Sequence, residues 1–343
     1  MNANDINVLK TYFSKTRNIV LVAHKNPDGD AVGSTTAMAM FYKKLGHNVQ
    51  VILPNGIPEF ISWIPGVDEV YRYDLQNAQS KKALDDADVT FLLDFNALHR
   101  VGDDMQKGLE EFTGDFIMID HHQQPDDIAM VTYSDTSICS TCQMVYHYID
   151  ALGQTDVIDA AIASSLYTGI MTDTGSFRFS STTSTTHRVI ASLIDKGAKN
   201  AIIHNQVFGN NSYSRLQLLG KALTNLKIIE GCKTAYITLT QEDLNFYNYK
   251  KGDTEGVVNY ALSLKGIVMA AIFIEDSDQE IVKISFRSKG KFSVNQFARS
   301  YFDGGGHDNA AGARSIASLE QTVEKFTGLV AKHQQDILVS YEI

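Results

Sequence analysis

The segment NIVLVAHKNPDGDAVGSTTAMAMFYKKLG, residues 18–46, runs from an apolar stretch through an acidic turn into a helical pattern. Residues 18–24 form a short, continuous apolar run, which is typical of a buried strand. Residues 31–46 place apolar side chains at helical spacing and end on a glycine cap. Between the two, Asp28 and Asp30 flank a glycine on a tight turn. A strand joined to a helix in this way predicts one unit of a parallel α/β sheet.

The same strand pattern recurs in the first half of the chain. The runs are NVQVILP (48–54), VTFLLDF (89–95) and DFIMIDHH (115–122). Polar, helix-like stretches separate them, which favours an α/β fold with a mostly parallel, doubly wound sheet. In such sheets, ligands bind beyond the carboxyl ends of the strands. We therefore expect a site where these strands end.

The pattern changes in the second half of the chain. Helical patterns dominate up to residue 226, and the strand-like runs TAYITLT, GIVMAAIFIED and EIVKISFRS follow, with helix candidates between and after them. The 343 residues fit two domains at a prior of roughly 150 residues each. We expect a catalytic domain over residues 1–192, a helical linker over 193–229 and a smaller α/β domain over 230–343.

Composition limits the location and the partners of the protein. A formal charge of −10 disfavours the many phosphate contacts that long duplex nucleic acid requires. No apolar run approaches the ~18 residues of a membrane span, and the N-terminus lacks a secretory pattern, so we expect a cytoplasmic protein with no membrane partner. Three cysteines are too few for a disulfide framework. We interpret Cys139 and Cys142 as buried small side chains rather than as a redox or zinc pair.

Acidic and histidine side chains gather at the predicted ends of strands and helices. The candidates are His24, Asp28 and Asp30 after the first strand, Asp94 after VTFLL, Asp120, His121 and His122 closing DFIMIDHH, and Asp173 after an apolar helix. Each has an ordinary alternative when taken alone. The Asp-Gly-Asp turn can cap a helix, a strand-end Asp can be a cap, one histidine can be structural, and Asp173 can simply terminate its helix. Their recurrence at strand ends favours one shared site.

The types of side chain indicate hard divalent cations. Carboxylates and imidazoles without thiolates suit Mn²⁺, Mg²⁺ or Fe²⁺ better than a structural zinc site. So many carboxylates in one crevice would repel one another without cations. Two ions about 3.5–4 Å apart can activate water and hold the oxygens of a phosphoryl group. The sequence therefore predicts a two-metal phosphoesterase site.

These motifs, in this order, resemble the DHH phosphoesterase superfamily. AHKNPDGDAVGS, strand-end Asp94, the Asp120-His121-His122 triplet and Asp173 match its motifs, and GGGHDNAAGA (304–313) matches the signature of the DHHA1 accessory domain. The resemblance covers nearly the whole chain. The subgroup that it points to is the stand-alone nano-RNase and pAp-phosphatase proteins, which include pApA and cyclic-di-AMP phosphodiesterases. It implies a catalytic DHH domain followed by a substrate-binding DHHA1 domain.

The resemblance implies a role for each site residue. One ion would be held by His24, Asp28 and Asp94, and the other by Asp30, Asp94, His121 and Asp173, so that Asp94 bridges the two. His122 would face the scissile phosphate, with Asp94 as the second catalytic residue, and Asp120 would orient a histidine. Members of the family generally prefer Mn²⁺, with Mg²⁺ as the alternative.

A second group, in the C-terminal domain, is expected to bind substrate. It consists of Arg287, Asn295, Gly304, Gly305, Gly306 and His307. Consecutive glycines form a loop whose backbone N–H groups can approach a phosphate closely, and Arg287, at a predicted strand end, can bind phosphate through two N–H groups. A glycine run alone would be only a flexible turn, and the adjoining histidine favours the substrate loop.

We therefore expect hydrolysis of short nucleotides by metal-activated water. The candidate substrates are nano-RNA, pApA and 3′-phosphoadenosine-5′-phosphate, held at a terminal phosphate or base by the C-terminal domain. The relatives suggest a homodimer. Within the superfamily, the alternatives are a RecJ-like single-strand exonuclease and a cyclic-di-AMP phosphodiesterase. The alternative from another class is a non-catalytic nucleotide sensor, which would bind nucleotide without turnover.

Overall fold

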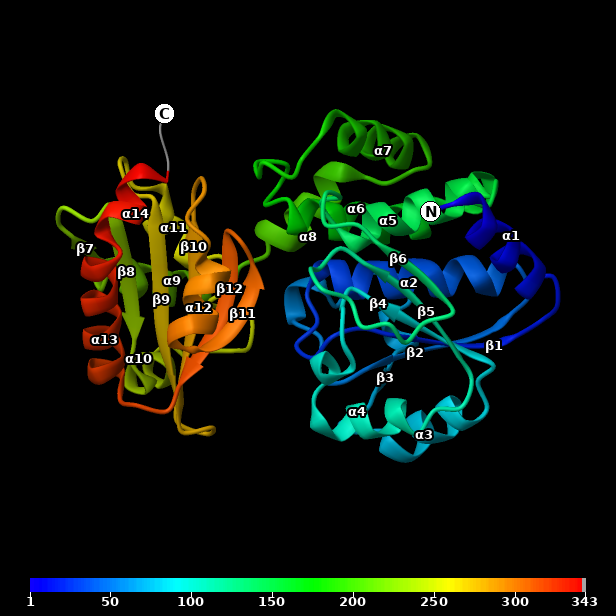
Figure 1. Ribbon diagram of the computed structural model, residues 1–343, viewed down its shortest axis with the longest axis horizontal. Coiled ribbons are helices and arrows are strands. Elements are labelled where there is room, and N and C mark those ends of the chain that lie inside the picture. Colours follow the sequence, from blue (N-terminus) through cyan, green and yellow to red (C-terminus); the bar gives the residue numbers. More distant parts are fainter. Residues whose placement is uncertain (341–343) are drawn as a thin grey trace. The chain divides into compact units, whose positions relative to one another are not determined.

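Residues 1–340 are described by a computed structural model, and the chain divides into two units between Asn210 and Asn211 (Figure 1). Each unit has its own six-stranded sheet and its own hydrophobic core. Among the described residues, no helix is both long enough and apolar enough to cross a membrane.

The sheet of the N-terminal unit is parallel throughout. Its strands are β1 (Asn18–Val22), β2 (Asn48–Leu53), β3 (Tyr71–Arg72), β4 (Val89–Leu93), β5 (Asp115–Asp120) and β6 (Val131–Ser134). They are ordered β3-β2-β1-β4-β5-β6, and every neighbouring pair is parallel. The direction of winding therefore reverses between β1 and β4, which is the point where such sheets bind ligands.

Helices cover both faces of this sheet. They are α1 (Ala3–Tyr12), α2 (Gly29–Lys44), α3 (Asn77–Asp85), α4 (Asp103–Glu110), α5 (Thr141–Ala151), α6 (Ala160–Asp173), α7 (Ser184–Asp195) and α8 (Asn200–Phe208), with the 3₁₀ helices η1 (Glu59–Ile61), η2 (Val67–Glu69), η3 (Leu98–Val101) and η4 (Thr155–Val157). Figure 1 shows α2, α5 and α6 on one side of the sheet and α3 and α4 on the other. Strand residues alternate between the two cores: Leu21 packs with the α2, α5 and α6 side, and Val22 with the α3 and α4 side.

Glycines bring α2 and α6 into close contact. A Cβ atom at Gly33 would lie 2.6 Å from the carbonyl oxygen of Ser165, and one at Gly29 would meet the side chain of Thr172. Only glycine fits at these two positions of α2. The first turn of α2 therefore lies against the last turn of α6, so that the carboxylates of Asp30 and Asp173 come near each other.

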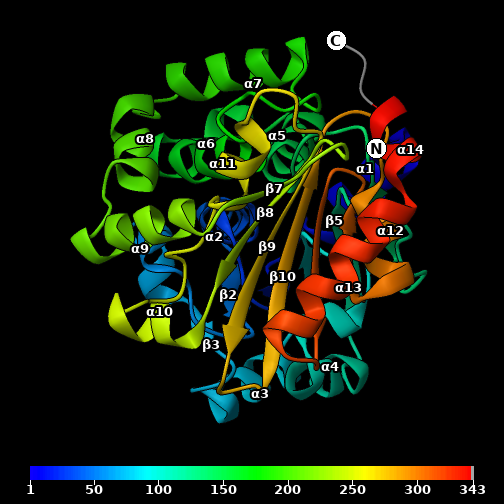
Figure 2. The same ribbon diagram turned by 90° about the vertical axis from the view of Figure 1, so that its left-hand side faces the viewer.

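The sheet of the C-terminal unit is mixed. Its strands are β7 (Lys227–Ile229), β8 (Thr234–Leu239), β9 (Met269–Asp276), β10 (Ile281–Ser288), β11 (Asp303–His307) and β12 (Ala310–Ser315), in the order β11-β12-β10-β9-β8-β7. Only β8 and β9 are parallel neighbours among these described strands. The helices are α9 (Tyr213–Thr224), α10 (Gln241–Phe246), α11 (Val258–Ser263), α12 (Val294–Tyr301), α13 (Leu319–Lys332) and α14 (Gln334–Val339). Figure 2 shows α9 to α11 on one side of this sheet and α12 to α14 on the other.

The structure confirms the predicted fold class and corrects one detail of it. The run 304–307 was expected to be a loop, but it lies in the edge strand β11, paired antiparallel with β12. The two units divide inside the segment 193–229 that we expected to be a linker, with α8 in the first unit and α9 in the second. Cys139, Cys142 and Cys232 are buried and form no disulfide, as predicted for the first two.

Candidate metal centre

The turn between β1 and α2 supplies His24, Asp28 and Asp30. Asp28 caps α2, because its Oδ1 accepts the backbone N–H groups of Asp30 at 3.0 Å and Ala31 at 3.1 Å. The same Oδ1 lies 3.9 Å from Nε2 of His24. Nδ1 of His24 bonds to the carbonyl of Lys25 at 3.0 Å, which fixes the ring with Nε2 toward the carboxylates. The sequence offered helix capping and a place in the acidic cluster as alternative roles for Asp28. In the structure Asp28 does both, since it caps α2 and lies beside His24.

Asp94 lies at the centre of the cluster. It follows β4, it is 2% exposed, and its φ of 65° is in the left-handed region, which costs energy for a residue with a Cβ. Its Oδ2 is 3.5 Å from Nε2 of His24, and its Oδ1 is 3.4 Å from Nε2 of His121. The backbone at Asp94 is thus held in an unfavourable conformation at the position from which one carboxylate reaches two histidines.

The end of β5 places two histidines with different partners. Nε2 of His121 lies 3.4 Å from Asp173 Oδ2 and 3.9 Å from Asp30 Oδ2, while its Nδ1 bonds to a backbone carbonyl. Nδ1 of His122 bonds to Oδ1 of Asp120 at 2.6 Å, and the backbone N–H of His122 donates to the other oxygen of Asp120 at 3.1 Å. Asp120 therefore orients His122, and a main-chain carbonyl orients His121.

All eight predicted residues of the N-terminal unit thus lie in one cluster, in contact with Asp94 or with its neighbours. The ligand atoms of His24, Asp28 and Asp94 lie within 4.8 Å of one another, and so do those of Asp30, Asp94 and His121. Asp173, at the end of α6, joins the second group through His121. Asp94 is common to both groups.

The pKa values of His24, Asp30 and Asp173 are raised because several carboxylates are buried close together. Burial and the carboxylates of Asp94 and Asp173 raise the pKa of Asp30 well above its usual range. Burial raises the pKa of Asp173 to about 7. Burial opposes protonation of His24, but Asp94 and Asp28 outweigh it and raise the pKa of His24 to about 9. The protein alone therefore holds protons where divalent cations would neutralise the same carboxylates.

The turn after α6 is strained. Gly175, Ser176 and Phe177 all have positive φ values, of 55°, 62° and 66°. Consecutive left-handed residues with side chains are unfavourable and persist only where the surroundings hold them. Here the ring of Phe177 packs on Tyr167 and His187. This strained turn begins two residues after Asp173, the last residue of α6.

In the C-terminal unit, Asn295 ties α12 to the glycine strand. Its Oδ1 accepts the backbone N–H of Gly306 at 3.0 Å and Nε of Arg299 at 3.2 Å. The backbone N–H of Gly306, which we predicted to bind phosphate, is therefore bonded to Asn295. A Cβ atom at Gly305 would lie 3.4 Å from Nε of Arg299, so that side chain lies along the strand. Arg287 lies at the end of β10, where its guanidinium donates to the carbonyl of Phe286 at 2.9 Å.

Sequence reasoning missed two residues at these places. Thr141, the first residue of α5, donates to Asp94, and Arg299 lies beside the glycine strand. Neither residue belongs to a recognisable motif. A Thr after an N-cap Ser, as at Thr141, and an Arg on an amphipathic helix, as at Arg299, are common and indicate no function by themselves. Only the packing of distant segments distinguishes them.

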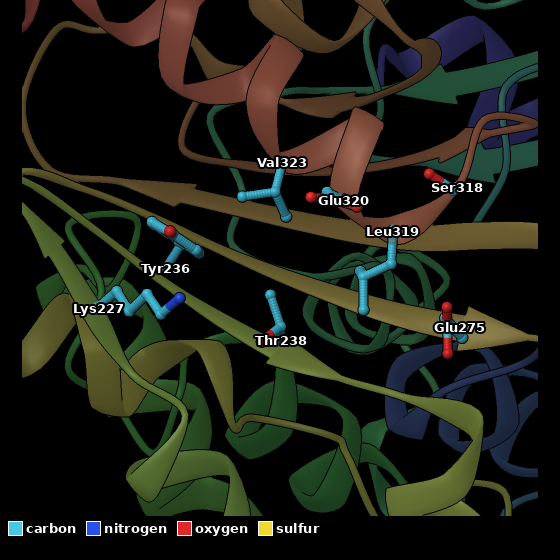
Figure 3. Close-up of a pocket in the computed structure, with 8 residues that line it drawn as sticks. All are labelled: Lys227, Tyr236, Thr238, Glu275, Ser318, Leu319, Glu320 and Val323. Atoms are coloured by element: carbon cyan, nitrogen blue, oxygen red, sulfur yellow. The ribbon is translucent and has the colours of Figure 1, made fainter.

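A pocket of about 460 Å³ lies elsewhere on the C-terminal unit (Figure 3). It is lined by Lys227, Tyr236, Thr238, Glu275, Ser318, Leu319, Glu320 and Val323. Figure 3 shows side chains of β7, β8 and β9 facing side chains from the beginning of α13. None of the predicted substrate-binding residues lines this pocket, so it is separate from the glycine strand.

Comparison with known proteins finds relatives that align with most of the chain. Residues 18–170 match the DHH family, N-terminal domain, and residues 233–333 match the DHHA1 domain. The bifunctional oligoribonuclease and PAP phosphatase NrnA of Thermus thermophilus is 32% identical over 90% of this chain and 87% of its own length. The protein of the same name from Bacillus subtilis is 27% identical over 88% of this chain and 90% of its own. The crystal structure of an exopolyphosphatase-related protein from Bacteroides fragilis matches with a TM-score of 0.94 and 37% identity over 98% of both chains.

Proposed function

This chain belongs to the DHH family of phosphoesterases, and on that premise we propose that it hydrolyses short nucleotides with two divalent cations. The cations would be held by His24, Asp28 and Asp94 on one side and by Asp30, Asp94, His121 and Asp173 on the other. The observation that carries this proposal is the position of Asp94, whose carboxylate is common to both groups of ligand atoms.

The residues present fit a pair of hard cations. Four carboxylates and two imidazoles converge without a thiolate, which suits Mn²⁺ and Mg²⁺. Both histidines have Nδ1 bonded to main-chain carbonyls and Nε2 toward the carboxylates, as metal-binding histidines do. The raised pKa values of Asp30 and Asp173 are the sign of negative charge that a cation would balance. We propose Mn²⁺ as the first ion to test, with Mg²⁺ beside it.

The chain's own residues would position the reacting groups. When bound, the cations supply a lowered pKa for an attacking water and positive charge for the phosphoryl oxygens. Asp94 would serve both sites, because its carboxylate belongs to both groups of ligand atoms. Nδ1 of His122 lies 2.6 Å from Oδ1 of Asp120, which orients the ring, and the Nε2 edge would hydrogen-bond a phosphate oxygen.

Short nucleotides are the proposed substrates because of three observations. Two relatives that align with 90% and 88% of this chain are named bifunctional oligoribonuclease and PAP phosphatase. The net charge of −10 disfavours long nucleic acid. The C-terminal unit offers Arg287, Arg299 and His307 around a glycine strand, a set suited to one phosphate or one terminal nucleotide rather than to a polymer. We propose that Gly304, Gly305 and Gly306 allow the close approach of that group.

A substrate panel tests the proposal. Protein stripped of metal would be assayed with and without Mn²⁺ on pApA, 3′-phosphoadenosine-5′-phosphate, RNA of two to five nucleotides, cyclic di-AMP, inorganic polyphosphate and bis-p-nitrophenyl phosphate. We expect Mn²⁺-dependent turnover, highest on the short linear nucleotides. Binding of nucleotide without turnover would favour a sensor, and turnover confined to polyphosphate would refute the choice of substrate while leaving the hydrolase intact.

A further inference from the structure

The beginning of α5 contacts two of the proposed metal-binding carboxylates at once. Thr141 donates its backbone N–H to Oδ2 of Asp30 at 2.6 Å and its hydroxyl to Oδ1 of Asp94 at 3.0 Å. The backbone N–H of Cys142 donates to the other oxygen of Asp30 at 2.8 Å. Just before them, the carbonyl of Ile138 accepts from Nδ1 of His121 at 3.3 Å. One short segment thus reaches a carboxylate from α2, a carboxylate after β4 and a histidine after β5.

These contacts act where hydrogen bonds to charge are strong. Thr141 is fully buried, and Asp30 and Asp94 are 1% and 2% exposed. Water therefore does not compete for the carboxylate oxygens, and a donated proton fixes each carboxylate rotamer. The N-terminus of a helix also carries partial positive charge, which favours an anion such as Asp30 beside it.

We propose that Thr141 is a positioning residue that holds Asp30 and Asp94 at the spacing that the two cations require. The inference rests on the proposed function, because it concerns the same site. Asp94 belongs to both ligand groups and Asp30 to one, so a single residue that fixes both carboxylates fixes the relation between the two sites before an ion arrives. The backbone bond to Asp30 survives any substitution at Thr141 except proline, so a side-chain change isolates the bond to Asp94.

The test compares Thr141→Val with Thr141→Ser and with a matched control. Valine keeps the shape and removes the hydroxyl, whereas serine keeps the hydroxyl and removes the methyl group. Thr90→Val is the control, since Thr90 is fully buried on β4, the strand that leads to Asp94, and its hydroxyl has no hydrogen-bond partner among the described residues. Removing that hydroxyl should cost nothing. The readout is the dissociation constant for Mn²⁺, measured by titration calorimetry on metal-free protein.

We expect Thr141→Val to weaken the binding of Mn²⁺ by about 10- to 100-fold, as the loss of an outer partner of a metal ligand does. Thr141→Ser and Thr90→Val should stay within about threefold of the original protein. Loss of turnover in Thr141→Val should be recovered largely by raising Mn²⁺, with an unchanged KM for the nucleotide. A purely structural role would not give that recovery.

Other outcomes separate the two proposals. If the original protein binds no Mn²⁺, the proposed function fails and this inference falls with it. If the original protein binds Mn²⁺ and Thr141→Val binds it equally well, only the positioning role is overturned. If Thr141→Val does not fold, Thr141→Ala replaces it, and equal Mn²⁺ affinity of the alanine and serine variants overturns the inference.

Discussion

The two candidate sites of this protein are built from different parts of the chain. In the N-terminal unit, the carboxylates of Asp30 and Asp94 are buried, and backbone N–H groups of α5 hold Asp30 while the hydroxyl of Thr141 holds Asp94. In the C-terminal unit the relation is reversed. There the backbone of β11 forms the surface, and a buried side chain, Asn295, holds it in place. A metal site needs fixed charges, and a nucleotide site needs a surface that a phosphate can approach closely.

The largest expected effect is that of removing the shared carboxylate. Asp94→Asn and Asp94→Ala should abolish turnover on every substrate, by at least about 10³-fold, because several kcal/mol of metal-derived stabilisation are lost. Asparagine tolerates the left-handed backbone at this position, so it keeps the fold. Activity assays and Mn²⁺ titration measure the effect, with the exposed Asp85→Asn as control. Activity above one tenth in Asp94→Asn would contradict a bridging role.

A second prediction concerns protons, which only the N-terminal site should exchange for metal. His24, with a pKa of about 9, and Asp173, with a pKa of about 7, hold protons in the metal-free protein. Both folded-state values lie above the unfolded ones, so the stability that these groups give the metal-free protein is lost as pH rises from about 4 through 7 for Asp173 and from about 6.5 through 9 for His24. Mn²⁺ replaces those protons, so its apparent affinity should rise about tenfold per pH unit for each proton displaced.

Melting curves with Mn²⁺ and with EDTA, between pH 6.5 and 8.5, measure this exchange. The difference in Tm between the two should widen as pH rises. A difference that is constant with pH would mean that the cations bind without displacing protons from these groups. Nucleotide added without metal should leave the pH dependence of Tm unchanged, because the proton exchange is assigned to His24 and Asp173 in the N-terminal unit.

A third prediction separates the two sites by substrate. His307→Ala should reduce kcat/KM for pApA by roughly tenfold or more, the cost of one hydrogen bond to a charged group. It should spare bis-p-nitrophenyl phosphate, which has no nucleotide for the C-terminal unit to hold. Asn295→Ala should act in the same direction, because it releases the backbone of Gly306. Equal losses on both substrates would show that the division of roles between the units is wrong.

The smallest effect is expected from packing. Gly33→Ala introduces a methyl group against the backbone of α6 and should destabilise the N-terminal unit by about 1–3 kcal/mol. Gly220→Ala is the matched control, since a Cβ atom there meets nothing within 4 Å, and alanine should stabilise α9 by about 0.5–1 kcal/mol. Thermal unfolding gives both values. If Gly33→Ala melts no lower than the original protein, the α2–α6 contact is not tight.

The sequence predicted what depends on local pattern. The apolar strands that became β1, β2, β4 and β5 were recognisable, and their ends located the acidic cluster. The sequence analysis did not identify β3 and β6, because strands of two and four residues are too short to show a hydrophobic periodicity. Strand β11 escaped because glycines have no side chains to alternate, and its pairing with β12 decides its conformation. Thr141 escaped because its role depends on segments that are distant in sequence.

The contact between α2 and α6 bears on the size of the cation that the proposed centre would hold. Asp30 leaves α2 close to the backbone of α6, which ends at Asp173, so the spacing of the two carboxylates depends on this contact. Ligand distances near 2.1 Å, such as Mg²⁺ requires, suit a rigid frame, whereas Ca²⁺ seeks longer bonds and more oxygens. If Asp30 and Asp173 hold a cation as proposed, this close helix contact should favour Mn²⁺ or Mg²⁺ over the larger Ca²⁺.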